Sequence, residues 1–248
     1  RSRVLLDRIL PSWGGFFHTT LQLGEAYCAV YLDSRPETAE RLLDALESVE
    51  LTGTVRFIAR SVRGELELTR GRVRTAALIQ RVSLRYAGRW RSILGAGSQW
   101  ELSILGMCLV TDLELTPADA AELDAPAIRA RATALLRDIL SDPSPLLRDI
   151  PTIMAFAAAV GLSAAAAAQA GSEQRDVGAE LVATALAVGT NQTFRLLSHD
   201  YLRSRTEQLD ARALSAAEDR IRALDGAQLV AHATGLARRL VSEAGWSR

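Results

Sequence analysis

The sequence predicts an α+β protein that is predominantly helical, with a small mixed α/β region over residues 1–115 and an α-helical bundle over residues 116–248. Three observations lead to this prediction. Residues 1–115 hold most of the aromatic residues and most of the runs with β-branched residues. The residues after 115 are rich in alanine, leucine and arginine, and they carry several helix start signals. Two prolines in the segment Ser141–Pro145 mark a linker between helices of the bundle.

The first region begins with a helix that Pro36 opens and that ends near Val49, with leucines spaced along one face. A strand is expected over 51–59, because this segment is rich in β-branched residues. Residues 64–69 alternate strictly between polar and apolar side chains, which predicts a second strand. A turn at Arg70-Gly71 then leads into a third strand, or a strand running into a helix, over 72–78. The apolar run 100–115 fits a buried strand or a buried helix.

The second region reads as five or six helices with short loops, which favours a bundle. Thr116 and Pro117 supply an N-cap and a first-turn proline. Further helices are expected over the following segments: one restarting at Asp124 and reaching about Leu140, an alanine-rich helix to about Ala170, one from Glu173 to about Leu209, and helices starting at the motifs Ser215-x-x-Glu218 and Asp225-x-x-Gln228.

Part of the first region resembles a known family. The pattern is Leu42-Leu43-x-x-Leu46, then Thr52-Gly53-Thr54-Val55, Gly64-Glu65-Leu66-Glu67-Leu68 and Gly71-Arg72-Val73-x-x-Ala76. This pattern, over about residues 42–77, resembles the PATAN domain family, a small α/β module of bacterial signalling proteins. The resemblance implies a role in interaction rather than chemistry, and it carries over no catalytic residue.

The composition excludes several kinds of chemistry. The chain has 29 basic and 29 acidic residues, so no net charge draws it toward nucleic acid or anionic lipid. Two cysteines do not make a disulfide scaffold or a cysteine-based zinc site. All basic residues are arginine, which excludes Schiff-base, Walker and kinase lysines. We interpret the missing lysine as the codon bias of a bacterium with a GC-rich genome.

Arginine is concentrated between Val55 and Arg91, where ten arginines stand against two glutamates. A row of arginines with interleaved aromatic rings could hold phosphates and stack on bases. Alternatively, these are solvated surface residues, neutralised by the acidic segment 101–124 across a fold or subunit contact. The candidate binding residues are Arg56, Arg60, Arg70, Arg72, Arg74, Arg85 and Trp90.

Other groups of residues that could form a catalytic or metal site lack some of the side chains that such a site needs. His199-Asp200 resembles the pair found in metal phosphohydrolases, but only His18 and His232 remain as further histidines, so we expect a surface histidine. Cys28 and His18 could form a nucleophile and base, but the surroundings of Cys28 favour a packed, inert thiol. The cluster Trp13–His18 fits either an exposed partner-binding edge or an aromatic plug over the core.

No secretion signal is expected at the start of the chain, because Asp7 and Arg8 break its apolar run. Residues 150–174 are long enough to span a bilayer, but their alanine content and their acidic flanks favour a buried helix of a soluble bundle. A membrane partner is therefore not expected.

We therefore expect a non-enzymatic interaction or regulatory module of the bacterial cytoplasm, homo-oligomeric and without a cofactor, that acts through protein–protein contacts. The alternative is a protein that binds nucleic acid or an anionic ligand through Arg56–Arg91. A third hypothesis is a small-molecule enzyme with a pocket between the two regions.

Overall fold

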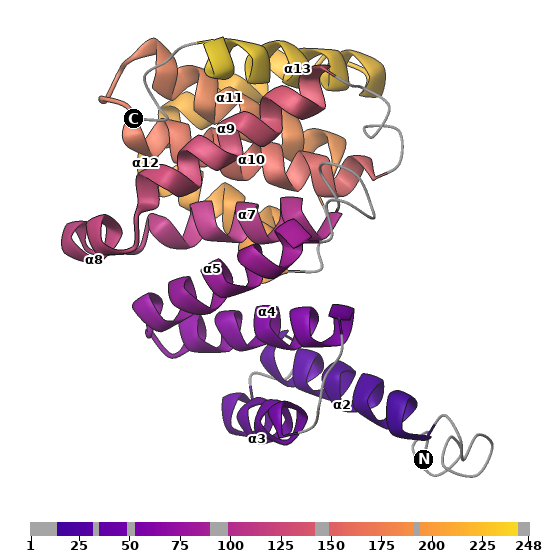
Figure 1. The fold of residues 1–248 in the computed structure, drawn as a ribbon. Helices are drawn as coiled ribbons and strands as arrows, with labels where there is room; N and C mark the ends of the chain where they lie inside the picture. Colours follow the sequence, from indigo (N-terminus) through magenta and orange to yellow (C-terminus); the bar gives the residue numbers. More distant parts are fainter. Residues whose placement is uncertain are drawn as a thin grey trace. The chain divides into compact units, whose positions relative to one another are not determined.

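The computed structural model describes residues 14–31, 35–48, 53–89, 99–141, 149–190 and 194–242. Every element in these ranges is a helix, and none of them contains a strand (Figure 1). The predicted mixed α/β region over residues 1–115 is therefore wrong, and the described part of the protein is all-α. The prediction that the second half of the chain forms a bundle of helices is confirmed.

The chain divides into two compact units, Arg1–Ser83 and Leu84–Arg248. The boundary between these units falls inside one helix, α5 (Val73–Arg89), whereas the residue composition changes near residue 115.

Unit 1 contains α2 (Gly14–Tyr31), α3 (Pro36–Glu47), α4 (Gly53–Thr69) and the first part of α5. Helices α2, α3 and α4 pack against one another. Their apolar core repeats every three or four residues on each helix, as expected for amphipathic helices. The core residues are Leu23, Ala26, Ala29, Val30, Ala39, Leu43, Leu46, Ala59, Val62 and Leu66.

The segments expected to be strands form α4 and the first turns of α5. The described buried apolar residues of α4, namely Ala59, Val62 and Leu66, are three and four residues apart, which is the helical period. The polar–apolar alternation over 64–69 covers only six residues, and its glutamates and leucines are good helix formers. The predicted turn is correct: Gly71 has φ +72° and joins α4 to α5.

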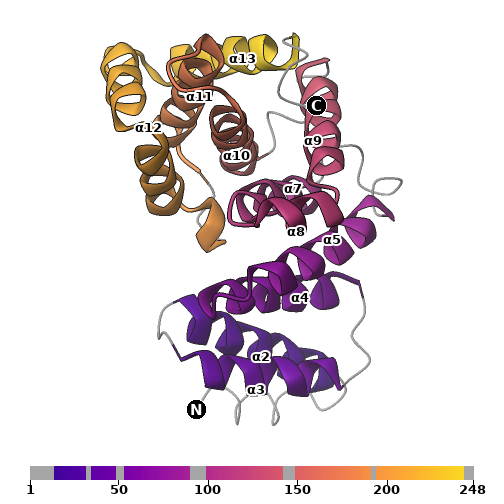
Figure 2. The same ribbon diagram turned by 90° about the vertical axis from the view of Figure 1, so that its left-hand side faces the viewer.

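Unit 2 is built around α10 (Ile150–Ala167). Helices α7 (Gln99–Asp112), α11 (Glu173–Val188), α12 (His199–Ile221) and α13 (Gly226–Ser242) pack against it (Figure 2). Because it is apolar and 18 residues long, α10 could cross a membrane by length and composition alone; 78% of these residues are buried inside the protein. The run 100–115, for which the sequence allowed a strand or a helix, forms the helix α7 as far as Asp112.

Two further helices and a 3-10 turn complete unit 2. Helices α8 (Pro117–Glu122) and α9 (Ala125–Ser141) follow α7, and the 3-10 turn Arg195–Leu197 precedes α12. The predicted cap is present at α8, where the Thr116 hydroxyl accepts from the Asp119 amide at 3.1 Å. A reciprocal capping box opens α13, with Asp225 and Gln228 each accepting from the backbone amide of the other at 2.8 and 2.9 Å.

Helices α10 and α11 approach closely at two glycines. A Cβ placed on Gly161 would lie 2.7 Å from the carbonyl oxygen of Gly178. A Cβ placed on Gly178 would lie 2.5 Å from the carbonyl oxygen of Gly161. The two backbones therefore touch at a point where no side chain fits.

The single helix expected from Glu173 to about Leu209 is wrong in its extent. Helix α11 ends before Gly189, which has φ +111°. Helix α12 is then broken at Asp210, whose φ of −162° and ψ of 88° are not helical. We call the two parts of α12 its first arm, residues 199–209, and its second arm, residues 211–221. The Asp210 carboxylate accepts from the Ala213 amide at 3.0 Å and so caps the second arm.

Candidate functional site

Unit 1 contains a groove of about 670 Å3 between α4 and α5, bordered by the last residue of α3. We call it the α4–α5 groove. Its lining combines three arginines and one acid with an apolar wall. The lining residues are Glu47, Arg56, Ala59, Arg60, Arg63, Leu78, Ile79 and Val82.

The two walls of the groove differ in chemistry. Arg56, Arg60 and Arg63 lie four and three residues apart on α4, so they share one face of that helix. The facing wall comes from α5 and consists of Leu78, Ile79 and Val82. Leu78 is 44% exposed, which is high for a leucine with an apolar neighbourhood. The groove therefore offers guanidinium groups on one side and an apolar surface on the other.

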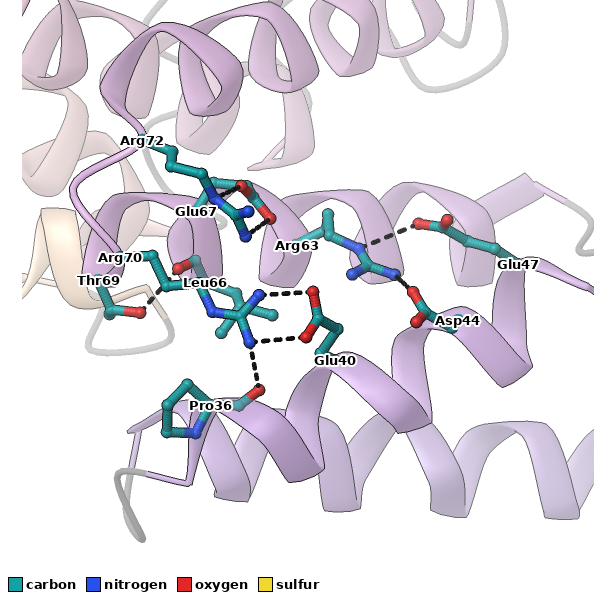
Figure 3. A network of polar contacts seen from close by, with 10 residues as sticks. All are labelled: Pro36, Glu40, Asp44, Glu47, Arg63, Leu66, Glu67, Thr69, Arg70 and Arg72. Atoms are coloured by element: carbon teal, nitrogen blue, oxygen red, sulfur yellow. Dashed lines mark hydrogen bonds and ion pairs between the residues drawn. The ribbon is translucent and has the colours of Figure 1, made fainter.

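Helices α3 and α4 are joined by a ladder of ion pairs (Figure 3). Arg70 donates from both terminal nitrogens to Glu40, at 2.6 and 2.8 Å, and to the Pro36 carbonyl oxygen at 3.3 Å. Further along, Arg63 bonds to Asp44 and, at 3.3 Å, to Glu47. Residue numbers rise along α3 as they fall along α4, so the two helices run antiparallel through the ladder.

The bidentate pair at one end of this ladder favours the charged form of both groups. The hydrogen bonds from Arg70 lower the pKa of the Glu40 carboxyl below its ordinary value. The same bonds raise the pKa of the Arg70 guanidinium.

The predicted binding residues do not form one surface. Arg56 and Arg60 line the α4–α5 groove. Arg70 is engaged in the ladder with Glu40, and Arg72 is bonded to Glu67 at 2.6 Å. The remaining three lie elsewhere: Arg74 is exposed at the start of α5, Arg85 is exposed within unit 2, and Trp90 lies outside the described residues.

Arg56 differs from the other arginines of α4. Among the residues that the structure describes, it forms no hydrogen bond or ion pair. It lies on the part of α4 before Arg63, beyond the point where the acidic residues of α3 end at Glu47. Arg56 is thus a cation of the groove that no described carboxylate neutralises.

Sequence reasoning missed Arg63, Glu47 and the apolar wall of the groove. The candidate residues chosen from the sequence included Arg70, Arg72 and Arg74, whereas α4 places Arg56, Arg60 and Arg63 together in the groove. The signal was present in the sequence as the helical spacing of these three residues. Residues three and four apart share a face only in a helix, so the expectation of a strand concealed this grouping.

The other candidate sites remain incomplete. His199 Nδ1 lies 3.5 Å from Asp200 Oδ1, and both side chains are exposed. Within the described ranges, no three His, Cys, Asp or Glu side chains are grouped so as to hold a metal ion. Cys28 is half-buried and Cys108 is buried, both as free thiols. The side chains of the cluster Trp13–His18 lie outside the described residues.

The chain matches no family model, no curated protein and no solved structure. The similarity of residues 42–77 to the PATAN family therefore stays a prediction.

Proposed function

We propose that the protein is a non-enzymatic interaction module that binds an acidic, amphipathic helical segment of a partner protein in the α4–α5 groove. The observation that carries this proposal is the pairing of an arginine wall with an apolar wall, which includes the exposed Leu78, in one groove. A helix that docks in a groove uses apolar anchors on one face. Carboxylates beside those anchors would meet Arg56 and Arg60.

The ion-pair ladder supports the choice of an acidic partner. Helix α3 already binds α4 through acidic residues spaced three and four apart, Glu40, Asp44 and Glu47. This acidic row stops at the last residue of α3, while the arginine row of α4 continues through Arg60 to Arg56. A partner with glutamates four residues apart would extend the same pattern of contacts.

The apolar wall supports a protein segment over a nucleic acid. Leu78, Ile79 and Val82 offer a surface that leucine or valine side chains can cover, with a gain proportional to the apolar area removed from water. A phosphate backbone has no group for that wall. Arg63, Arg70 and Arg72 are already bonded to carboxylates, which leaves less positive charge for phosphates than the sequence predicts.

The test uses the full chain and a synthetic helical peptide with glutamates four residues apart beside a leucine stripe, labelled for fluorescence anisotropy. Saturable one-to-one binding is expected, weakening as salt is added. Replacing Arg56, which is partly exposed, by Glu turns an attraction into a repulsion, each worth about 1 kcal/mol, so affinity should fall about tenfold or more. Leu78→Gln should also weaken binding.

The matched control is Arg41→Glu, a charge reversal at an exposed position of α3 that does not line the groove. It should leave affinity within about twofold. Equal affinity for the Arg56 and Arg41 variants, or no binding of the peptide, would overturn the proposal. Tighter binding of a 12-base-pair DNA, lost steeply with salt, would instead support nucleic-acid binding.

A further inference from the structure

Unit 2 contains a second pocket, separate from the α4–α5 groove, with a volume of about 450 Å3. It is lined by residues from α10, from the first arm of α12 and from the turn that follows α7. We call it the α10–α12 pocket. Its lining residues are Leu113, Leu162, Ala166, Arg205, Gln208 and Leu209.

Two features of the helices leave this space open. The first arm of α12 ends at Leu209, because the backbone leaves the helix at Asp210. Gln208 and Leu209 are thus the last side chains before the break, and no further turn of the first arm covers the pocket. On the facing side, the end of α10 is a run of alanines that includes Ala166. Methyl side chains at this end of α10 fill little of the volume.

The polar corner of the pocket is held in place by Glu114. One oxygen of this carboxylate lies 2.6 Å from a terminal nitrogen of Arg205 and accepts from the Tyr201 hydroxyl at 3.3 Å. Burial, together with the nearby Glu114 charge, raises the pKa of Tyr201 to about 12, so its hydroxyl keeps its proton at neutral pH. Arg205 is thereby fixed at the pocket wall before any ligand arrives.

The two polar lining residues face the pocket mainly as donors. The second terminal nitrogen of Arg205 donates to Gln208 Oε1 at 2.7 Å, which occupies the acceptor of that amide. A guanidinium carries five N–H groups, more than these two bonds use, and the Gln208 amide nitrogen is also a donor. A ligand for this corner must therefore accept hydrogen bonds, while its remainder must suit Leu113, Leu162, Ala166 and Leu209.

We propose that the α10–α12 pocket binds a small monocarboxylate with an apolar chain, with its carboxylate on Arg205 and its chain against α10. Arg205 has N–H groups beyond the two that bond to Glu114 and Gln208, and these can donate to the oxygens of a ligand carboxylate. A volume of about 450 Å3 is within the range of small-molecule sites, and a largely apolar lining with a few fixed polar groups is typical of them.

The experiment is isothermal titration of the full chain with octanoate, and separately with octan-1-ol, which has the same chain length without the charge. Octanoate should bind at one saturable site, and octanol should bind at least about tenfold more weakly, since hydrogen bonds to charged groups contribute about twice as much as neutral ones.

Two variants test the two halves of the pocket. Arg205→Gln should weaken octanoate binding about tenfold or more and leave octanol binding little changed. Ala166→Leu should weaken both ligands by filling the pocket, and it keeps the polar corner intact in case the Arg205 variant is less stable. Arg212→Gln is the matched control, because Arg212 is exposed on the second arm and does not line the pocket.

Octanoate binding that Arg205→Gln and Ala166→Leu leave unchanged would overturn this proposal, as would unsaturable uptake or no binding. None of these results bears on the α4–α5 groove, whose residues belong to the other unit.

Discussion

Arg203 and Glu218 are 15 residues apart in the sequence, yet the guanidinium of Arg203 donates to the carboxylate of Glu218. In an unbroken helix their backbones would be about 22 Å apart along the axis, beyond the reach of both side chains. The two arms of α12 therefore fold back toward each other at Asp210, and the ion pair ties their far ends together. The position of this break also determines where the α10–α12 pocket ends.

The cap at the break can be tested by substitution of Asp210. Asp210→Ala should lower the free energy of unfolding by about 1 kcal/mol, because the Ala213 amide loses its acceptor. Asp210→Asn should stay close to wild type, since asparagine caps helices as well as aspartate does. Urea denaturation followed by circular dichroism measures both. Equal losses in the two variants would show that the charge, and not the cap, matters here.

The contact between α10 and α11 predicts a strong size limit at Gly178. Gly178→Ala should destabilise unit 2 by about 1–3 kcal/mol or more, because the added methyl group meets the Gly161 carbonyl. Gly235→Ala in α13 is the matched control: a Cβ there meets nothing within 4 Å, and alanine favours the helix, so stability should rise by about 0.4–1 kcal/mol. Thermal unfolding of both variants checks the pair. Two losses of similar size would contradict the close contact.

Glu180 should make stability depend on pH. Its carboxylate lies 2.8 Å from Arg220 Nη2 and 2.8 Å from His232 Nε2, so it links three helices. Burial acts to raise the pKa of Glu180, but the bonds to Arg220 and His232 outweigh burial, and the pKa is lowered. The stability that the charged carboxylate contributes is therefore present above about pH 4.3, its unfolded pKa, and is lost as the pH falls through the lower folded value.

Replacing Glu180 by Gln should consequently reduce the free energy of unfolding at pH 7 by about 1–3 kcal/mol, with a smaller difference from wild type at pH 3. The control, Glu207→Gln, removes an exposed ion pair with Arg203 and should cost about 1 kcal/mol or less. Urea denaturation at the two pH values measures both variants. A difference for Glu180→Gln that does not shrink in acid would contradict this account.

Gln80 predicts a stabilising substitution. Its side chain is fully buried, and neither amide atom has a hydrogen-bond partner among the described residues. Gln80→Met keeps the length of the side chain and removes the unsatisfied amide. The free energy of unfolding should therefore be about 1 kcal/mol higher than in wild type. Gln228→Met should lower the free energy of unfolding, since Gln228 completes the capping box of α13. Calorimetric unfolding compares them, and destabilisation by Gln80→Met would mean that the amide is used in the folded protein.

The elements predicted best from the sequence are those with a complete local signal. Thr116-Pro117 and Asp225-x-x-Gln228 specify helix starts through their own side chains, and both caps are present. The helix start predicted at Ser215-x-x-Glu218 is wrong, because this motif lies inside the second arm of α12 and Glu218 is bonded to Arg203. The helix opened by Pro36 was also predictable, because Ala39, Leu43 and Leu46 fall on one stripe. Such signals depend on residues within one or two turns of each other, so a single sequence contains them in full.

Segments with an ambiguous local signal were predicted wrongly. The alternation over 64–69 fits a strand of six residues, and only packing against α2 and α3 shows that Val62 and Leu66 follow a helical period. The break at Asp210 was missed for the same reason. Aspartate there is a good N-cap, but nothing nearby in the sequence shows that Arg203 will meet Glu218.

For the α4–α5 groove, the sequence indicated the right segment of the chain but only some of the residues that line the groove. The concentration of arginine after Val55 pointed to Arg56 and Arg60. It could not show that Arg70 and Arg72 are occupied by Glu40 and Glu67, because ion pairing between separate helices depends on tertiary structure.

The central place of α10 also has a consequence for biosynthesis. Of the helices that cover it, α7 precedes it in the chain, whereas α11, α12 and α13 follow it, and the last of them ends about 75 residues later. At about 5–20 residues per second, a ribosome needs about 4–15 s to add them. Until the last of these helices has been made, the cover of this apolar helix of 18 residues is incomplete, and the nascent chain exposes apolar surface that a chaperone can bind.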